Sequence, residues 1–258
     1  MTDKIGDLIL KYRPNSEILT YEGMLFEKQK GGDYYANWYV LAGFPALQPF
    51  NPLVENSDWP LIYQSSFNDS NFPANCYMQY YLINIPVSIE DYLLTLNSNK
   101  RRKARRAFEE TDKLSLKVLK GIDKKMLHDY LYGKNPDPEF YGQHFMMEAV
   151  DILEGGFTLG LYDSEKLLGY NFMVSSGRTL YYLGAIMLDE NITGNMVVAS
   201  HIKYAIENVY RYYDMENIPL ISEPRTAYKH SYFNKEVWLP TYTKNIDRSK
   251  YSWLKEKI

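Results

Sequence analysis

Short runs of hydrophobic residues, separated by clusters of Gly, Pro, Asn and Asp, make up the first 85 residues of the chain. The runs are rich in aromatic and β-branched residues, which is typical of strands joined by loops. We expect strands at Met24–Lys28, Tyr35–Ala42, Leu61–Gln64 and Met78–Ile85. This part of the chain is therefore predicted to consist of strands and loops.

Beyond residue 85 the hydrophobic spacing becomes that of helices. Ser88, followed three positions later by Asp91, predicts a helix start, because a Ser side chain there accepts a hydrogen bond from the backbone of the first turn. A second helix is predicted over Ser98–Glu110. After it, Leu114–Leu119 alternates like a strand, with Val118 on the same face as two leucines.

The rest of the chain alternates between helical and strand patterns. Helices are predicted at Ile122–Tyr132, Pro138–Leu153, Met196–Tyr212 and Arg225–Phe233, and strands at Phe157–Tyr162, Leu167–Ser175, Thr179–Met187, Asp214–Ile218 and Glu236–Tyr242. Short polar turns separate the first three of these strands, which should pair as an antiparallel meander. The order indicates an α+β fold without the glycine fingerprint of a dinucleotide-binding fold.

Charge and cysteine content narrow the function classes. The net charge of −3 over 258 residues gives no overall attraction to nucleic acid or to an anionic membrane. The single cysteine, Cys76, excludes an internal disulfide and a thiolate-rich zinc site. The sequence has no signal-peptide pattern and no apolar run long enough to span a bilayer, so we expect a cytoplasmic protein.

The most basic segment is a candidate anion site. Lys100–Arg106 holds six basic residues in seven positions. On a helix these side chains could clamp phosphate, because guanidinium groups bind phosphate oxygens in pairs. The alternative is a solvated helix face balanced by the acidic residues Glu109, Glu110 and Asp112.

Asn191–Met196 joins a predicted strand to a predicted helix and is a second candidate site. Backbone N–H groups at a helix N-terminus can receive a pyrophosphate, and Gly194 would let the backbone approach it closely. An ordinary helix entry accounts for the same residues.

A third candidate lies in the predicted helix over residues 225–233. Tyr228, Lys229 and Tyr232 share one side of it. A tyrosine can donate a proton to a leaving group, and a lysine can hold a phosphate or carboxylate, whereas aromatic core contacts are the alternative. The four histidines lack the spacing of metal ligands, so no metal is expected.

Several segments follow one another in an order found in one group of transferases. They are Tyr81–Ala107, Leu161–Tyr170, Thr179–Ala185, and Tyr213–Asp214 followed by Ala227–Tyr232. Together they resemble the GNAT-like acyltransferases of the CelD type, relatives of the Fem-type peptidoglycan aminoacyltransferases. The resemblance implies a GNAT-like mixed sheet flanked by helices. It also implies an abbreviated N-terminal GNAT-like half at residues 1–85 and an acyltransferase domain at residues 86–258.

The resemblance further implies transfer of an acyl group from acyl-CoA, acetyl-CoA first of all, to an amine of a small-molecule or peptide acceptor. The amine would attack the thioester directly, and a backbone N–H between Ile186 and Leu188 would stabilise the oxyanion. The pyrophosphate would be held by the backbone N–H groups of Thr193, Gly194, Asn195, Met196 and Val197.

Side chains would then supply proton transfer and charge. Tyr228 or Tyr232 would protonate the leaving thiolate, and Glu190 or its neighbour Asp189 would act as base. Arg105 and Lys229 would bind an anionic part of the donor or acceptor.

Three alternatives stay open at this point. One is Fem-like transfer from aminoacyl-tRNA to a peptide or sugar-peptide, although the coiled-coil arm of those enzymes has no counterpart here. Another is a nucleic-acid-binding protein acting through residues 100–106. The last is a GNAT-like binding module without activity. Asn191 and Met196 depart from the Gln or Arg and the Gly or Ala usual at the ends of the acyl-CoA loop. The sequence leaves the oligomeric state open.

Overall fold

The computed structural model of the chain describes residues 2–21, 24–28, 33–36, 58–64, 73–119, 125–129, 141–215, 227–251 and 254–256. The chain forms two compact units. One comprises Met1–Tyr80 and Glu236–Ile258, and the other comprises Tyr81–Lys235. The division into domains at residue 85 stays a prediction.

The first unit is built on paired strands. They are β1 (Glu17–Tyr21), β2 (Met24–Lys28), β3 (Tyr35–Ala36), β4 (Leu61–Gln64), β11 (Lys235–Lys244), β12 (Leu254–Glu256) and the start of β5 (Cys76–Asn84). The pairs β1/β2, β2/β3 and β4/β11 are antiparallel, and β3/β4 is parallel. β12 pairs antiparallel with β5. The C-terminal strands thus pair with N-terminal ones, which places residues 236–258 in this unit.

The expectation of only strands and loops in the first 85 residues was wrong, because the chain begins with a helix. α1 (Thr2–Tyr12) buries Ile5, Leu8, Ile9 and Tyr12. Steps of three and four residues between buried positions are those of an amphipathic helix. The helical spacing was therefore present in the sequence, but it was overlooked beside the strand patterns of the residues that follow.

The second unit holds the sheet that carries the candidate site. Its strands are β6 (Leu114–Val118), β7 (Gly156–Asp163), β8 (Lys166–Ser176), β9 (Thr179–Met187) and β10 (Tyr212–Asp214). Strands β7, β8 and β9 form the predicted antiparallel meander, and β6 pairs antiparallel with β7. β10 lies parallel to β9, and its other edge pairs with the end of β5.

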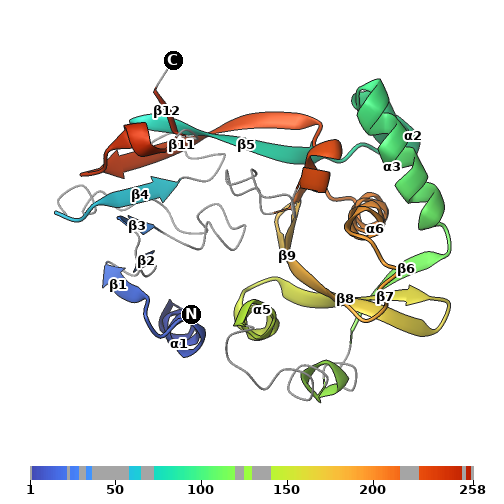
Figure 1. Cartoon of the computed structure of the whole chain (residues 1–258), viewed down its shortest axis with the longest axis horizontal. Helices are drawn as coiled ribbons and strands as arrows, with labels where there is room; N and C mark the ends of the chain where they lie inside the picture. Colours follow the sequence, from blue (N-terminus) through green and yellow to red (C-terminus); the bar gives the residue numbers. More distant parts are fainter. Residues whose placement is uncertain are drawn as a thin grey trace. The chain divides into compact units, whose positions relative to one another are not determined.

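The second unit also holds five helices with described bounds (Figure 1). They are α2 (Ile89–Thr95), α3 (Ser98–Glu110), α5 (Tyr141–Ile152), α6 (Gly194–Glu207) and the 3-10 helix η3 (Ala227–Ser231). α3 and α6 lie on one side of the strands and α5 on the other. A short 3-10 helix, η4 (Arg248–Lys250), belongs to the first unit. The α+β class, with a mixed sheet flanked by helices, is confirmed.

Local capping fixes the helices that precede β6. Ser88 Oγ accepts a hydrogen bond from the Asp91 N–H at 3.1 Å, which confirms the predicted helix start. Asn97 Oδ1 accepts one from the Lys100 N–H at 3.1 Å, and α3 spans the predicted residues. A side-chain cap of this kind contributes about 1 kcal/mol.

Several predicted details differ in the structure. The strand predicted at Asp214–Ile218 lies instead at Tyr212–Asp214, and the helix predicted at Arg225–Phe233 is, within the described residues, the short 3-10 helix η3. The helix predicted to reach Tyr212 ends at Glu207, because Val209 takes a left-handed φ of 58° and Tyr212 pairs in β10. Val118 is 51% exposed and does not share a buried face. Parts of other predicted elements lie outside the described residues, namely 37–42, 122–124, 130–132, 138–140, 216–218 and 225–226. No helix in the described ranges is long and apolar enough to cross a membrane.

Candidate functional site

The pairing of the parallel strands β9 and β10 stops at the C-terminal end of β10, and we call this place the fork. The last paired residues are Tyr181 and Asp214. β9 continues beyond this pair to Met187, whereas β10 ends there. A six-residue connection, 188–193, joins the end of β9 to α6.

A bulge in β9, which sequence reasoning missed, lies just beyond the last pair. Phe172 of β8 pairs with Gly184, and Met173 pairs with Tyr182, so Leu183 has no partner in this register. A bulge bends its strand and increases the local twist. It therefore favours a change in the course of β9 just beyond its pairing with β10. Gly184 was the available signal, because a glycine inside a strand often marks a bulge.

The first turn of α6 presents unused backbone donors. Thr193 caps the helix, and its Oγ1 accepts a hydrogen bond from the Met196 N–H at 3.3 Å. The Val197 N–H donates to the Thr193 carbonyl oxygen at 3.1 Å. The N–H groups of Thr193, Gly194 and Asn195 donate to no acceptor in the described part of the chain. The predicted row of five donors is thus reduced to three, at the positive end of the helix dipole.

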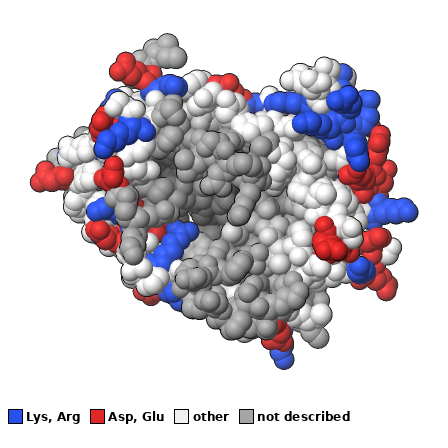
Figure 2. Space-filling model, viewed as in Figure 1, with Lys and Arg blue, Asp and Glu red and all other residues white. Residues whose placement is uncertain are grey.

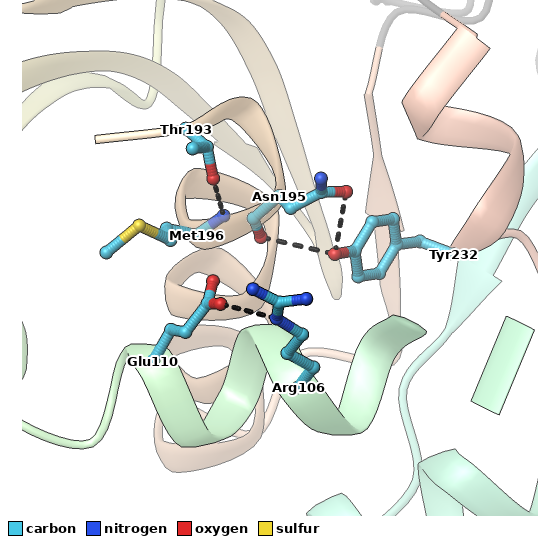
Figure 3. Close-up of polar contacts among 6 residues, drawn as sticks. All are labelled: Arg106, Glu110, Thr193, Asn195, Met196 and Tyr232. Atoms are coloured by element: carbon cyan, nitrogen blue, oxygen red, sulfur yellow. Dashed lines mark hydrogen bonds and ion pairs between the residues drawn. The ribbon is translucent and has the colours of Figure 1, made fainter. Parts of the chain in front are cut away.

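Tyr228 of η3 and Tyr232, the residue after η3, pack against this turn, and Figure 3 shows the Tyr232 hydroxyl directed at Asn195. The Tyr232 hydroxyl donates to the Asn195 carbonyl oxygen at 3.3 Å and to Asn195 Oδ1 at 3.1 Å. The Tyr228 ring faces Gly194 so closely that a Cβ there would lie 2.7 Å from Tyr228 Cζ. A Cβ at position 194 would therefore force the Tyr228 ring to shift.

The two hydroxyls differ in their environment. Tyr232 is fully buried, and Tyr92 Oη donates to its carbonyl oxygen at 2.6 Å. Burial raises the pKa of Tyr232, and the charge of Glu110 raises it further. Tyr228 is partly exposed, and burial raises its pKa as well. Since the Tyr232 hydroxyl already bonds to Asn195, Tyr228 is better placed to meet a ligand.

Lys229 extends to the place where the pairing of β9 with β10 ends. Its Nζ donates to the carbonyl oxygen of Met215, the residue after β10, at 2.7 Å. The same Nζ lies 5.4 Å from the centroid of the Tyr182 ring, on the β9 side. An ammonium group here can stabilise negative charge that enters or develops between the strands.

The predicted oxyanion donors at the end of β9 are engaged in the sheet. The Leu188 N–H donates to the Leu168 carbonyl oxygen at 2.8 Å, and Ile186 is paired with Tyr170. The Leu188 N–H is therefore not open to an oxyanion, which corrects that part of the prediction. Leu183, which the register leaves without a partner residue, is the remaining candidate segment of β9.

Asp189 and Glu190 follow β9 and differ in their contacts. Asp189 accepts hydrogen bonds from Lys166 Nζ at 3.0 Å, from the Asn191 N–H at 3.0 Å and from Asn191 Nδ2 at 2.9 Å. These bonds lower its pKa to about 2, which makes it a poor base. Glu190 is exposed, and within the described ranges no hydrogen bond or ion pair engages its carboxylate.

We expect the Asp189 carboxyl to titrate near pH 2 rather than near its ordinary 3.8. Because the folded pKa is depressed, these bonds stabilise the loop at pH values above 3.8 and are lost as the pH falls toward 2. Carboxyl NMR shifts against pH measure the midpoint. Lys166→Met should raise it, whereas a midpoint near 3.8 in the unaltered protein would show that the contacts do not form.

The basic helix α3 uses part of its charge internally. Lys100 Nζ donates to the Phe233 carbonyl oxygen at 3.0 Å, and Arg101 donates to the carbonyl oxygens that end α2. Arg106 forms an ion pair with Glu110 at 2.8 Å. The basic side chains over α3 form a surface patch in Figure 2. Its exposed members without a partner in the described residues are Arg102, Lys103 and Arg105.

The structure thus brings together some of the predicted site residues. Gly194, Asn195, Tyr228 and Tyr232 are joined by direct contacts, and Lys229 projects from the same short helix. Neither a hydrogen bond nor an ion pair links Arg105 to this group in the part of the chain that is described. In the same part, no three His, Cys, Asp or Glu side chains are grouped as a metal site would require.

Solved structures with a similar course of the chain are known. L-PGS from Bacillus licheniformis is 12% identical, with a TM-score of 0.48 over 97% of this chain and 94% of that one. FemX is 9% identical, with a TM-score of 0.45 over 93% and 91% of the two chains. A GCN5-related N-acetyltransferase from Kribbella flavida is 6% identical, with a TM-score of 0.34 over 96% and 97%.

Sequence comparison gives no closer relation, since no family model and no curated protein matches the chain. The structural similarities are too distant to carry an inference about activity. The donor and the acceptor have to be argued from the residues of this chain, and the CelD-type relation stays a prediction.

Proposed function

We propose that this chain is a GNAT-like acyltransferase that moves an acyl group from acyl-CoA to an amine. The observation that carries the proposal is the set of N–H groups of Thr193, Gly194 and Asn195 at the start of α6, which follows β9 beyond the end of its pairing with β10. Those donors and the helix dipole suit a diphosphate. In this proposal an extended thioester arm lies beside the part of β9 beyond its last pair with β10.

In this proposal the acceptor amine attacks the thioester carbon directly. The carbonyl oxygen gains negative charge as the new C–N bond forms, and a backbone N–H at the β9 bulge near Leu183 stabilises it. The C–S bond then breaks, and the thiolate takes a proton from Tyr228. Lys229 attracts negative charge within the fork, and Glu190 receives the proton that the amine loses. Acetyl-CoA is the first donor to test.

Calorimetry with coenzyme A and acetyl-CoA tests the proposal. We expect both to bind, with an affinity that depends on the diphosphate, so that pantetheine alone binds much more weakly. A chain that binds neither coenzyme A nor acetyl-CoA is not an acyl-CoA-dependent transferase.

The two tyrosines should differ when each loses its hydroxyl. Tyr228→Phe is expected to lower turnover by about 100-fold with unaltered donor affinity, because general acid catalysis contributes 10²–10⁴. Tyr232→Phe should instead lower the midpoint of thermal unfolding, since it removes a buried hydrogen bond to Asn195. Thiol release from acetyl-CoA with a panel of amines measures turnover. Full activity in both variants would leave water as the proton donor.

The exposed arginines of α3 favour one alternative, a nucleic-acid ligand such as the RNA part of an aminoacyl-tRNA donor. With Arg102, Lys103 and Arg105 as the contacts, the logarithm of affinity should fall with the logarithm of salt concentration with a slope of about −2 to −3. Filter binding of an RNA oligonucleotide at several salt concentrations measures this slope. We expect no binding, and a steep slope that Arg105→Gln reduces would favour the alternative.

A further inference from the structure

A chain of hydrogen bonds lies buried beneath the fork, and the proposed mechanism does not use it. His201 of α6 lies between two partners from the sheet. Its Nδ1 is 2.6 Å from Tyr213 Oη of β10, and its Nε2 is 3.0 Å from Asn171 Oδ1 of β8. All three residues are fully buried. These hydrogen bonds therefore join β8 and β10, the strands on either side of β9, to α6.

The partners fix the tautomer of His201. Asn171 Oδ1 can only accept a hydrogen bond, so Nε2 carries the proton and Nδ1 accepts from the Tyr213 hydroxyl. The opposite arrangement, with the Asn171 amide turned around, would leave both Asn171 Oδ1 and the Tyr213 proton without a partner. As described, the one atom left over is Asn171 Nδ2. The neutral Nε2–H form therefore satisfies more of the buried groups.

The hydrogen-bonded group of His201, Tyr213 and Asn171 is linked to both partners of Lys229, namely Tyr182 and Met215. The His201 ring packs against the Tyr182 ring, with centroids 5.3 Å apart, and Tyr182 in turn lies beneath Lys229 Nζ. On the other strand, Tyr213 lies two residues before Met215, whose carbonyl oxygen accepts from Lys229. The Tyr182 ring and the Met215 carbonyl oxygen, which both contact Lys229, are therefore each linked to His201.

We infer that His201 is a positioning residue, which places the Lys229 ammonium at the mouth of the fork through Tyr182 and Met215. The inference rests on the proposed function in one respect only, which is that Lys229 binds the negative charge of a ligand. It requires that the neutral Nε2–H imidazole and its two partners act as one unit. Loss of the Tyr213 hydroxyl should then loosen Lys229 even though Tyr213 does not touch it.

The reactivity of Lys229 toward an acetylating reagent, followed by mass spectrometry, tests this without any ligand. Tyr213→Phe should raise the labelling rate of Lys229 by about threefold or more, as expected for coupled neighbours. Thr111→Val is the matched control, because it also removes one buried hydroxyl of the second unit, and the hydrogen bond it removes is to the Phe108 carbonyl oxygen in α3. That variant should leave Lys229 labelling unchanged. Equal rates in the two variants would overturn the inference.

Nitrogen NMR of the unaltered protein supplies a readout that needs no variant. We expect His201 to show an Nε2–H signal at pH 7, and an Nδ1–H signal or an imidazolium would overturn the inference. His201→Gln, which retains an amide donor, should keep Lys229 labelling closer to normal than His201→Leu does. Failure of coenzyme A binding would remove the proposed function but would leave these results unaffected.

Discussion

Gly194→Trp should abolish binding of coenzyme A, with a loss of at least about 100-fold, or about 2.7 kcal/mol. The indole would occupy the space at the helix tip that the Tyr228 ring now fills, and it would cover the N–H groups of Thr193 and Asn195. Thermal unfolding should remain cooperative, because the residue lies in the first turn of α6 rather than in the core. Calorimetry and circular dichroism measure the two quantities.

A smaller substitution separates the steric cause from general damage. In Gly194→Ala the new Cβ would lie 2.7 Å from Tyr228 Cζ, so the tyrosine ring must shift. Adding Tyr228→Ala removes this clash and should restore donor affinity to within about threefold of the value for Tyr228→Ala alone. If Gly194→Trp binds coenzyme A normally, the loop before α6 is not the diphosphate site.

Acidification should destabilise the protein through His201. Burial, together with the nearby charge of Lys229, lowers the pKa of His201 from 6.5 to about 3. The unfolded chain therefore takes up a proton below pH 6.5 that the folded protein does not accept until about pH 3. Stability rises with pH across this interval. Between pH 6.5 and 4.5 the free energy of unfolding should fall by about 2 kcal/mol from this residue alone.

Urea unfolding at several pH values measures the effect, with His201→Gln as the reference. The variant lacks the titrating ring, so the difference in unfolding free energy between the two proteins should shrink as the pH falls. This comparison cancels the titration of carboxylates that both proteins share. A difference that stays constant from pH 7 to 4.5 would show that His201 is not buried in its neutral form.

Local patterns were sufficient for much of the second unit. The helix start at Ser88, the bounds of α3 and the meander of β7, β8 and β9 follow from capping residues, apolar spacing and short polar turns. These features depend on neighbours within a few residues. The end of α6 was harder to predict, since Tyr212 leaves the helical pattern only because β10 pairs with β9.

The candidate site was predictable only where it depends on residues that are close together in the sequence. Gly194 and Tyr228 were recognised as candidates, but nothing in the sequence indicated that the Tyr228 ring would pack against Gly194. The Leu188 N–H was assigned to an oxyanion, whereas β8 already uses it. Hydrogen bonds across a sheet depend on register, and a bulge at Leu183 shifts that register by one residue.

The amino-acid sequence by itself determined the α+β class, most of the helices and strands of the second unit, and a glycine at the start of α6. The tertiary structure decided which groups meet. It engaged Lys100 and Arg101 with backbone carbonyl oxygens, directed the Tyr232 hydroxyl to Asn195, and set Lys229 between β9 and β10. Such pairings join residues far apart in the chain. Their partners are fixed by packing and strand register, which no local pattern encodes.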